Sequence, residues 1–361
     1  MTMQTPEQVQ MDQAKMEAFA GKMLGAVSGA FMSSLFSIGH RLGMFDKLAE
    51  MKPATSPEIA KTLGLQERYV REWLATMVTG GVVDYDPSNK TYSLPREHAA
   101  FLTRAAGPNN FAFFHQYTAM LGTVEPPLIE AFKNGGGVPY SAYTLFQDLQ
   151  AEESARLFDT ALTGVIVPFV QGLPERLKSG IDVLDVATGQ GRAVTLLAKE
   201  FPKSRFLGLD FSEEGVEAGR KEAAAWGLKN ARFEARDAAA GLPGKFDFIT
   251  AFDCIHDMAK PRQVLKNIAS ALKPGGTFLM MDIAGSSKLE ENISNPMAPL
   301  LYAASTLHCM TVSLAQGGEA VGTMWGEQKA QEYLHQAGFK KVEVQRIPDD
   351  PMHVFFVATL V

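Results

Sequence analysis

The fold is indicated most strongly by one stretch of the chain, Ile181-Asp-Val-Leu-Asp-Val-Ala-Thr-Gly-Gln-Gly-Arg192. It begins as an apolar, β-branched run with Asp185 near its end, passes through Gly189 and Gly191, and continues into the helical pattern of residues 193–200. This order predicts a strand, a tight turn and a helix. Glycine permits unusual backbone angles at such a turn and lets a ligand approach the unpaired N–H groups of the helix start. The stretch therefore predicts a nucleotide-binding turn.

A second apolar strand is predicted at residues 205–210, and it ends in Asp210. This acid follows Asp185 by about 25 positions, where a doubly wound fold places a carboxylate that binds a ribose. Further strands are predicted at residues 246–252, 277–283, 342–346 and 353–360, with a turn at 272–276. The spacing favours an α/β architecture with a mostly parallel sheet.

These motifs resemble those of class I S-adenosylmethionine-dependent methyltransferases. The family's first motif is an acid followed by small and glycine residues, and here Ala187 stands where its first glycine is usual. The resemblance implies a Rossmann-like doubly wound sheet whose last strand is antiparallel. It also implies that S-adenosylmethionine is the cofactor, held by residues spread over the first four strands: Asp185, Ala187, Thr188, Gly189, Gly191, Asp210, Phe211, Asp237, Ala238 and Asp253.

The chain before this region has a different pattern. Residues 7–49 repeat apolar side chains at helical spacing, with small residues between them, which predicts a long helix covered by a second copy of the chain. Residues 53–105 predict two helices and a hairpin, the layout of a winged helix. We therefore expect a helical and winged-helix dimerisation domain at 1–105, a helical linker contributing to the acceptor pocket at 106–180, and the methyltransferase domain at 181–361 with a lid insert at 284–326.

A winged helix can serve as a DNA reader or as a dimerisation scaffold. Residues 50–98 carry six basic against seven acidic side chains, whereas DNA binding depends on neutralising phosphates. We therefore expect no nucleic-acid partner. A winged-helix transcriptional regulator with a cofactor-sensing methyltransferase fold is the alternative of another class.

Composition sets the outer bounds. The chain has 361 residues, 46% hydrophobic and 20% charged, with a formal net charge of -6, which is ordinary for a soluble globular protein. Its polar N-terminus does not resemble a secretory signal, and the uncharged run at residues 23–39 is interrupted by glycine and serine, so we expect no membrane segment. With only Cys254 and Cys309, a cytoplasmic location is the expectation.

His256 is the candidate catalytic residue. It precedes Asp257 directly after the predicted strand 246–252, and similar small-molecule, plant-type O-methyltransferases place a general base there. The resemblance implies O-methylation of a small molecule, with His256 accepting a proton. The other interpretation of His256 is a packing residue, and the acids that flank the histidine in the plant enzymes have no clear counterpart here. S- or N-methylation of a small thiol, thioether or amine, by proximity alone, is the alternative reaction.

Aromatic residues near the domain junction are candidates for the acceptor pocket, namely His115, Tyr140, Tyr143 and His308. The competing interpretation is that they are core residues. Cys254, His256, His308 and Cys309 lack the ligand spacing of a zinc site. We therefore expect no metal.

Overall fold

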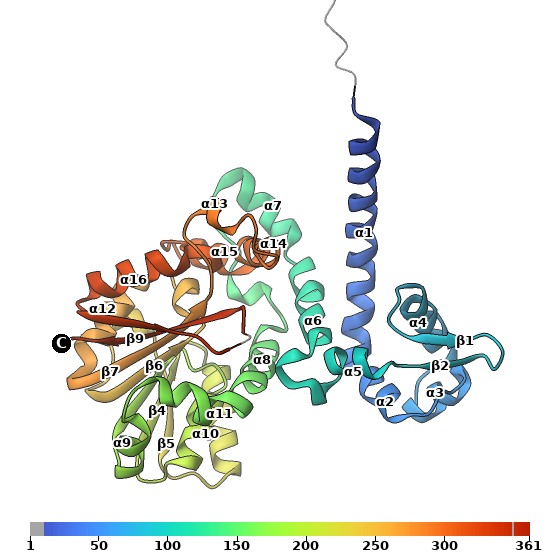
Figure 1. The fold of residues 1–361 in the computed structure, drawn as a ribbon. Coiled ribbons are helices and arrows are strands. Elements are labelled where there is room, and N and C mark those ends of the chain that lie inside the picture. Colours follow the sequence, from blue (N-terminus) through green and yellow to red (C-terminus); the bar gives the residue numbers. More distant parts are fainter. Residues whose placement is uncertain (1–10, 349) are drawn as a thin grey trace, which may run out of the picture. The chain divides into compact units, whose positions relative to one another are not determined.

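The computed structural model describes residues 11–348 and 350–361. The chain divides into two compact units, one ending at Ala119 and the other spanning Met120–Val361. Helix α6 (Phe111–Gly122) contains the boundary, so the segment expected as a linker at 106–180 is shared between the two units. In Figure 1 the first unit runs from blue to teal and the second continues to red.

The first unit begins with two helices, α1 (Gln13–Arg41) and α2 (Met44–Glu50). The prediction of one helix over 7–49 is wrong, and its residues 7–10 lie outside the described part. Gly43 interrupts the helix, because it takes a φ of 67° in the left-handed region. His40 and Leu42 mark the end of α1, where backbone N–H groups of the turn return to its last carbonyls.

The winged-helix prediction is confirmed by the next elements. Helices α3 (Ser56–Leu63) and α4 (Glu67–Thr79) precede the antiparallel pair β1 (Asp84–Asp86) and β2 (Thr91–Ser93), followed by α5 (Arg96–Leu102) and the 3-10 helix η1 (Arg104–Asn109). Thr55 and Glu58 form a capping box that starts α3. Phe45, Trp73 and Leu74 are buried in the core of this unit.

The second unit contains the predicted sheet. Its strand order is β5-β4-β3-β6-β7-β9-β8, in which β9 pairs antiparallel with both neighbours and the other pairs are parallel. The mostly parallel Rossmann-like fold is thereby confirmed. The strands are β3 (Asp182–Val186), β4 (Arg205–Asp210), β5 (Ala231–Ala235), β6 (Phe246–Phe252), β7 (Leu272–Ile283), β8 (Lys341–Gln345) and β9 (His353–Thr359). Strand β7 includes the predicted turn at 272–276 as an irregularity in its pairing with β6.

Helices cover both faces of this sheet (Figure 1). One face packs against α12 (Pro261–Ala271) and α16 (Gly326–Ala337), and the other against α9 (Leu173–Ser179), α10 (Arg192–Glu200) and α11 (Glu213–Ala225). Leu265 and Leu197 are buried on the two opposite faces. Because both faces are covered, the carboxyl ends of the parallel strands remain as the place for a ligand.

Before the sheet, the region predicted as a helical linker is divided into several short elements. It has α7 (Glu125–Asn134), the turn η2 (Tyr140–Ala142), α8 (Phe146–Ala161), a π-helical turn η3 (Leu162–Ile166), the 3-10 turn η4 (Val167–Phe169) and then α9. Pro168 lacks an N–H group and Gly172 takes a φ of 72°, so the helix ends between them and a new one begins.

The insert between β7 and α16, predicted at residues 284–326, is helical. It contains α13 (Leu289–Asn292), α14 (Ala298–Ala304), the π-helical turn η7 (Ser305–Cys309), α15 (Met310–Ala315) and the 3-10 turn η8 (Thr323–Trp325). Two further 3-10 turns follow strands, η5 (Ala238–Ala240) after β5 and η6 (Ile255–Asp257) after β6. The π-helical turn η7 carries His308 and Cys309. Single π turns inside α-helices are frequent at functional sites.

By length and composition alone, two helical stretches of the described chain could cross a membrane, Gln13–Arg41 and Ala298–Ala315. The second is one-third buried inside its own unit, whereas only 6% of the apolar window in α1 is buried. α1 therefore has an apolar surface that the described residues leave uncovered.

Candidate functional site

The turn between β3 and α10 leaves room for a ligand. A Cβ atom added to Gly189 would meet no atom within 4 Å, and this residue has a φ of 56°. A Cβ atom on Gly191 would instead lie 2.2 Å from the Phe233 ring. Gly189 thus allows the turn to face open space, while Gly191 allows α10 to pack closely on the sheet.

A cavity of about 440 Å³ opens at the carboxyl ends of the strands, beside this turn. That volume lies within the range of small-molecule and cofactor sites, roughly 300–1,000 Å³. Its lining includes the following cofactor candidates: Ala187, Thr188, Gly189, Asp210, Phe211, Asp237, Ala238 and Asp253. Asp185 lines a smaller adjoining cavity. The role of Gly191 is to let α10 pack closely on the sheet.

The two motif acids are held by hydrogen bonds to the turn. Asp185 accepts hydrogen bonds from the hydroxyls of Thr188 and Thr250, both at 2.7 Å, and burial raises the pKa of its carboxyl to about 6. Asp210 accepts backbone hydrogen bonds from Gly189 at 2.8 Å and Ser212 at 2.9 Å. Each Asp210 oxygen retains a lone pair, so the carboxylate can still accept hydrogen bonds from a diol.

The other side of the cavity is formed by the ends of β5 and β6. Asp237 accepts a hydrogen bond from the backbone N–H of Ala239 at 2.8 Å and so starts the turn η5. Phe211 is 60% exposed, and its ring lies 5.3 Å from that of Tyr140. Asp253 has a φ of 50°, its Oδ1 is buried without a hydrogen-bond partner among the described residues, and burial raises the pKa of its carboxyl to about 6.

His256 lies in the turn η6 between two carboxylates. Its Nδ1 donates to Asp282 Oδ1 at 2.8 Å, and its Nε2 is 3.1 Å from Asp257 Oδ1. Burial lowers the pKa of His256, but Asp282 and Asp257 together raise it well above the usual value. The two carboxylates therefore stabilise the imidazolium once Nε2 has gained a proton, whereas burial disfavours it.

Asp282 is the functional-site residue that the sequence interpretation missed. It follows Met281, which pairs with Phe252 at the end of the neighbouring strand β6, and it also accepts a hydrogen bond from the Trp325 indole at 3.0 Å. The available signal was an acid in an otherwise apolar strand, at the same edge of the sheet as His256. Trp325 thereby orients this acid.

Three of the four pocket candidates lie together in the second unit. The His308 ring stacks on Phe146 at 4.4 Å and meets the edges of Tyr140 and Tyr143. Burial lowers the pKa of His308, although Asp257 opposes that effect. Tyr140 lines the cavity, while the Tyr143 hydroxyl donates to the Leu307 carbonyl at 2.6 Å.

His115, the fourth pocket candidate, lies in the first unit. Its Nδ1 is 2.7 Å from the Ser33 hydroxyl, and its ring stacks on Phe36. Burial lowers the pKa of His115. These contacts join α6 to α1 within the first unit, and the assignment of His115 to an acceptor pocket stays a prediction.

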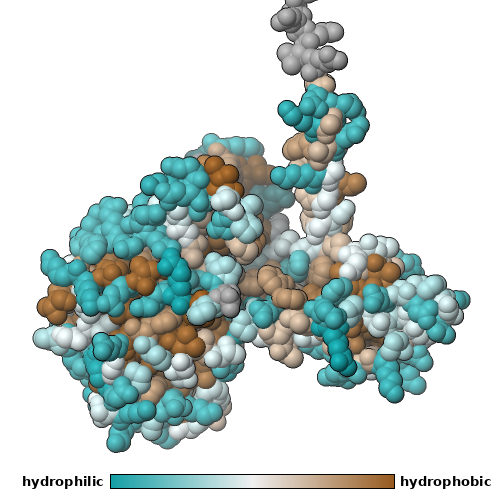
Figure 2. Space-filling model, in the orientation of Figure 1, coloured by the Kyte–Doolittle hydropathy of each residue, from teal (hydrophilic) through white to brown (hydrophobic). Residues whose placement is uncertain are grey.

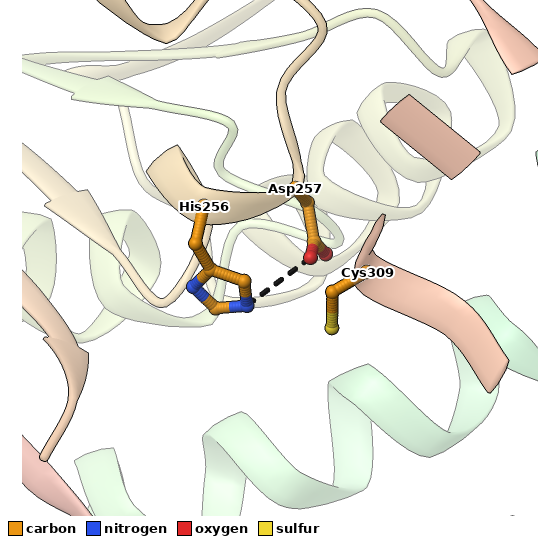
Figure 3. Close-up of side chains that lie close together, drawn as sticks. All are labelled: His256, Asp257 and Cys309. Carbon is orange, nitrogen blue, oxygen red and sulfur yellow. Dashed lines mark ion pairs between the residues drawn. The ribbon is translucent and has the colours of Figure 1, made fainter. Parts of the chain in front are cut away.

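Three side chains of types that can bind a metal ion also come together beside the cavity. Ligand atoms of His256, Asp257 and Cys309 lie within 4.8 Å of one another, and Figure 3 shows His256 and Asp257 on one turn with Cys309 on a separate helix. Cys254 instead donates to the Val186 carbonyl.

Comparisons with known proteins agree with this architecture. Residues 30–104 match the family described as Rv2258c-like winged HTH domain, and residues 177–343 match the methyltransferase domain family. A demethylmenaquinone methyltransferase of Listeria monocytogenes is 32% identical over 111 residues, which are 30% of this chain and 46% of that protein. The chain thus spans about half the length of this curated relative.

Solved structures extend the similarity over both regions. A solved structure described as a putative O-methyltransferase from Nostoc punctiforme has a TM-score of 0.72 at 18% identity, and the similarity covers 94% of this chain and 98% of that one. Human N-acetylserotonin methyltransferase, solved with SAM, has a TM-score of 0.69 at 17% identity, covering 97% and 98%. The chain therefore joins a winged helix–turn–helix domain to a methyltransferase domain, in the fold shared by class I methyltransferases.

Proposed function

We propose that the protein transfers a methyl group from S-adenosylmethionine to the oxygen of a small molecule. The observation that carries this proposal is the cavity at the strand ends, whose lining combines the open Gly189 turn with the acids Asp210 and Asp237. When bound, the cofactor supplies a methyl group on a sulfonium. The human enzyme of the same fold is solved with SAM, and its name describes methylation of a small molecule.

The chain's own residues account for the binding of such a cofactor. Asp210 is positioned by two backbone N–H groups and offers its remaining lone pairs to the ribose hydroxyls. Asp237 lines the cavity and can accept from the adenine amino group, while the exposed Phe211 ring can cover the adenine. Methyl transfer then depends on alignment and on exclusion of water.

Calorimetric titration with S-adenosylmethionine and with S-adenosylhomocysteine tests the cofactor site. We expect both to bind, and Asp210→Ala to weaken binding by at least about 10-fold, since hydrogen bonds to a charged group are lost. Asp84→Ala, an exposed position on β1 of the other unit, is the control and is expected to bind normally. Absence of binding by the unaltered protein would reject the proposed cofactor.

We further propose that His256 is the base that takes the acceptor's proton. Asp282 holds Nδ1, and the carboxylates beside the ring stabilise the imidazolium that forms when Nε2 gains a proton. With phenols as acceptors, His256→Ala is expected to reduce turnover about 10²–10⁴-fold with cofactor affinity retained. His335→Ala, at an exposed position of α16, serves as the control. Unchanged turnover would instead support S- or N-methylation by proximity alone.

The exposed apolar face of α1 supports a homodimer as the functional form. Gly21, Gly25 and Gly29 follow one another at helical spacing, and a Cβ atom on any of them would meet nothing within 4 Å. Large apolar side chains, including Phe19 and Phe31, are exposed on other sides of the same helix, and Figure 2 shows tan and brown side chains among white and teal ones along α1. The glycines and the large apolar side chains lie on different sides of α1, because successive residues are about 100° apart. A second copy of α1 can pack on the glycine side, since small residues let two helices approach closely. Light scattering of the purified chain tests this.

The paired charges of the winged helix support a scaffold rather than a DNA reader. On α4, Arg68 pairs with Glu72 and Arg71 with Glu67, so these cations are already neutralised beside the surface that would meet phosphates. A DNA complex at physiological salt that weakens steeply with added salt would overturn this assignment. The free thiols of Cys254 and Cys309 support a reducing, cytoplasmic setting.

A further inference from the structure

His256, Asp257 and Cys309 offer one nitrogen, one oxygen and one sulfur to a common point. Their ligand atoms lie within 4.8 Å of one another. Around a tetrahedral zinc ion, with bonds of about 2.0–2.3 Å, neighbouring ligand atoms are separated by about 3.4 Å. The three side chains therefore need only small rotations to reach one cation.

The histidine is already oriented as a metal ligand. Its Nδ1–H donates to Asp282 Oδ1 at 2.8 Å, and the Trp325 indole holds the same oxygen at 3.0 Å. This directs Nε2 toward Asp257 and Cys309 (Figure 3). A carboxylate that orients a histidine through its other nitrogen is the usual outer shell of protein zinc sites. The alternative group of Asp253, His256 and Asp282 lacks this feature, since it would use the nitrogen already bound to Asp282.

Asp257 and Cys309 supply the other two donor atoms. Asp257 Oδ1 is buried and lies 3.1 Å from His256 Nε2, and the Cys309 thiol also lies within hydrogen-bonding reach of the Asp257 carboxylate. Cys309 is a buried free thiol that the π-helical turn η7 places beside these residues. Asp257 also lines the cavity, so an ion has a route from solvent. A buried carboxylate is costly unless a cation or a proton meets it, and a metal ion can replace the protons of His256 and Cys309 in that role.

We propose that His256 Nε2, Asp257 Oδ1 and Cys309 Sγ bind a Zn²⁺ ion, leaving a fourth position for water or a small ligand. Binding releases the thiol proton of Cys309, and any proton on His256 Nε2, to solvent. Zinc and a proton cannot occupy Nε2 together. Bound zinc therefore prevents His256 from acting as a base, so the site is inhibitory; only this consequence rests on the proposed function.

Cobalt titration of the metal-free full chain tests the site without turnover or cofactor. We expect one equivalent of Co²⁺ to give the strong visible bands of a tetrahedral complex and a near-ultraviolet thiolate-to-cobalt band, both removed by Zn²⁺. Cys309→Ser is expected to lose the thiolate band and at least about 10-fold in affinity. Cys254→Ser is the matched control, because this second buried thiol lies outside the donor group, and it should retain both signals.

A second variant separates loss of a ligand from loss of the fold. Asp257→Asn preserves the side-chain volume and is expected to weaken cobalt binding while the chain still unfolds cooperatively. Absence of a tetrahedral spectrum in the unaltered protein would overturn the proposal, as would an unchanged spectrum in Cys309→Ser. Because no methyl donor is present, these outcomes are independent of whether the protein is a methyltransferase.

Discussion

Ala187 is an alanine in a conformation that suits glycine. It follows β3 with a φ of 56°, and this left-handed region costs an L-residue roughly 1–2 kcal/mol. Glycine removes that strain but adds conformational freedom to the unfolded chain, worth about 0.4–1 kcal/mol. The backbone strain at Ala187 is therefore larger than the entropy that glycine would add to the unfolded chain.

Ala187→Gly is therefore expected to raise the free energy of unfolding by about 0.5–1 kcal/mol, measured by urea denaturation. Ala224→Gly is the control, at an exposed position inside α11, and it should lower the free energy of unfolding by about 0.5–1 kcal/mol. Equal destabilisation by both changes would contradict the strain assigned to Ala187.

Asp185 makes stability depend on pH. Burial raises the pKa of its carboxyl to about 6 in the folded protein, above its unfolded value of roughly 3.9. The ionised form is thus disfavoured by folding. The resulting contribution to stability is present below the unfolded pKa and is progressively lost as pH rises through the folded pKa.

As pH rises from 4 to 7, the ionisation of Asp185 should lower the free energy of unfolding by about 2 kcal/mol. The Asp185→Asn variant has no ionisable group at this position. Its free energy of unfolding, relative to that of the unaltered protein, is therefore expected to rise by the same amount between pH 4 and pH 7. Urea denaturation at both pH values measures the difference. A difference that is independent of pH would show that Asp185 ionises normally in the folded chain.

At the scale of elements, the glycine-rich segment after α7, residues 135–138, packs against the helical insert. The Thr311 hydroxyl accepts a hydrogen bond from the Val138 backbone at 2.9 Å. A Cβ atom added to Gly137 would lie 1.9 Å from the Thr311 carbonyl oxygen. This contact positions the segment that leads to Tyr140 and Tyr143 against α15.

Gly137→Ala is expected to lower the free energy of unfolding by about 2–3 kcal/mol, because two backbones must separate. Gly122→Ala, at the last residue of α6 with no atom within 4 Å of the added Cβ, should change the free energy of unfolding by less than about 0.5 kcal/mol. Limited proteolysis should also cleave the Gly137 variant sooner within the insert. Similar stability of the two variants would mean that the segment and α15 separate at little cost.

At the scale of the whole molecule, the proposed dimer depends on close approach along α1. Gly25→Leu introduces a good helix former, so the helix is not weakened, but it adds a large side chain to the glycine side of α1. Light scattering is expected to show a dimer for the unaltered chain and a monomer, or a dimer weakened at least about 10-fold, for the variant. Ala26→Leu, one position further and about 100° around the helix, is the control and should remain dimeric.

A monomeric mass for the unaltered chain at every concentration would reject this dimer. Recovery of the unaltered chain in the membrane fraction would reject it also, because it would assign the apolar face of α1 to lipid rather than to a second copy. The length and composition of α1 permit either outcome. The glycine spacing and the exposed side chains support the helix partner.

Local patterns in the sequence were sufficient for most of the fold. The apolar strands, the glycines of the first turn and the capping of α3 are each encoded within a few residues, and their order predicts a doubly wound sheet. The errors fall where one residue ends a helix within an apolar pattern. Gly43 and Pro168 are examples, since periodicity continues past both of them.

The sequence by itself determined the sheet, the winged helix and the edge of the sheet where the cofactor residues lie. The carboxyl ends of parallel strands share one edge, and this does not depend on the structure of the loops. Only the tertiary structure decided which side chains surround His256. Asp282 reaches it from the neighbouring strand, and Cys309 reaches Asp257 from the π-helical turn of the insert. These contacts join residues that are distant in sequence, and their existence depends on strand register and helix packing, about which a local pattern carries no information.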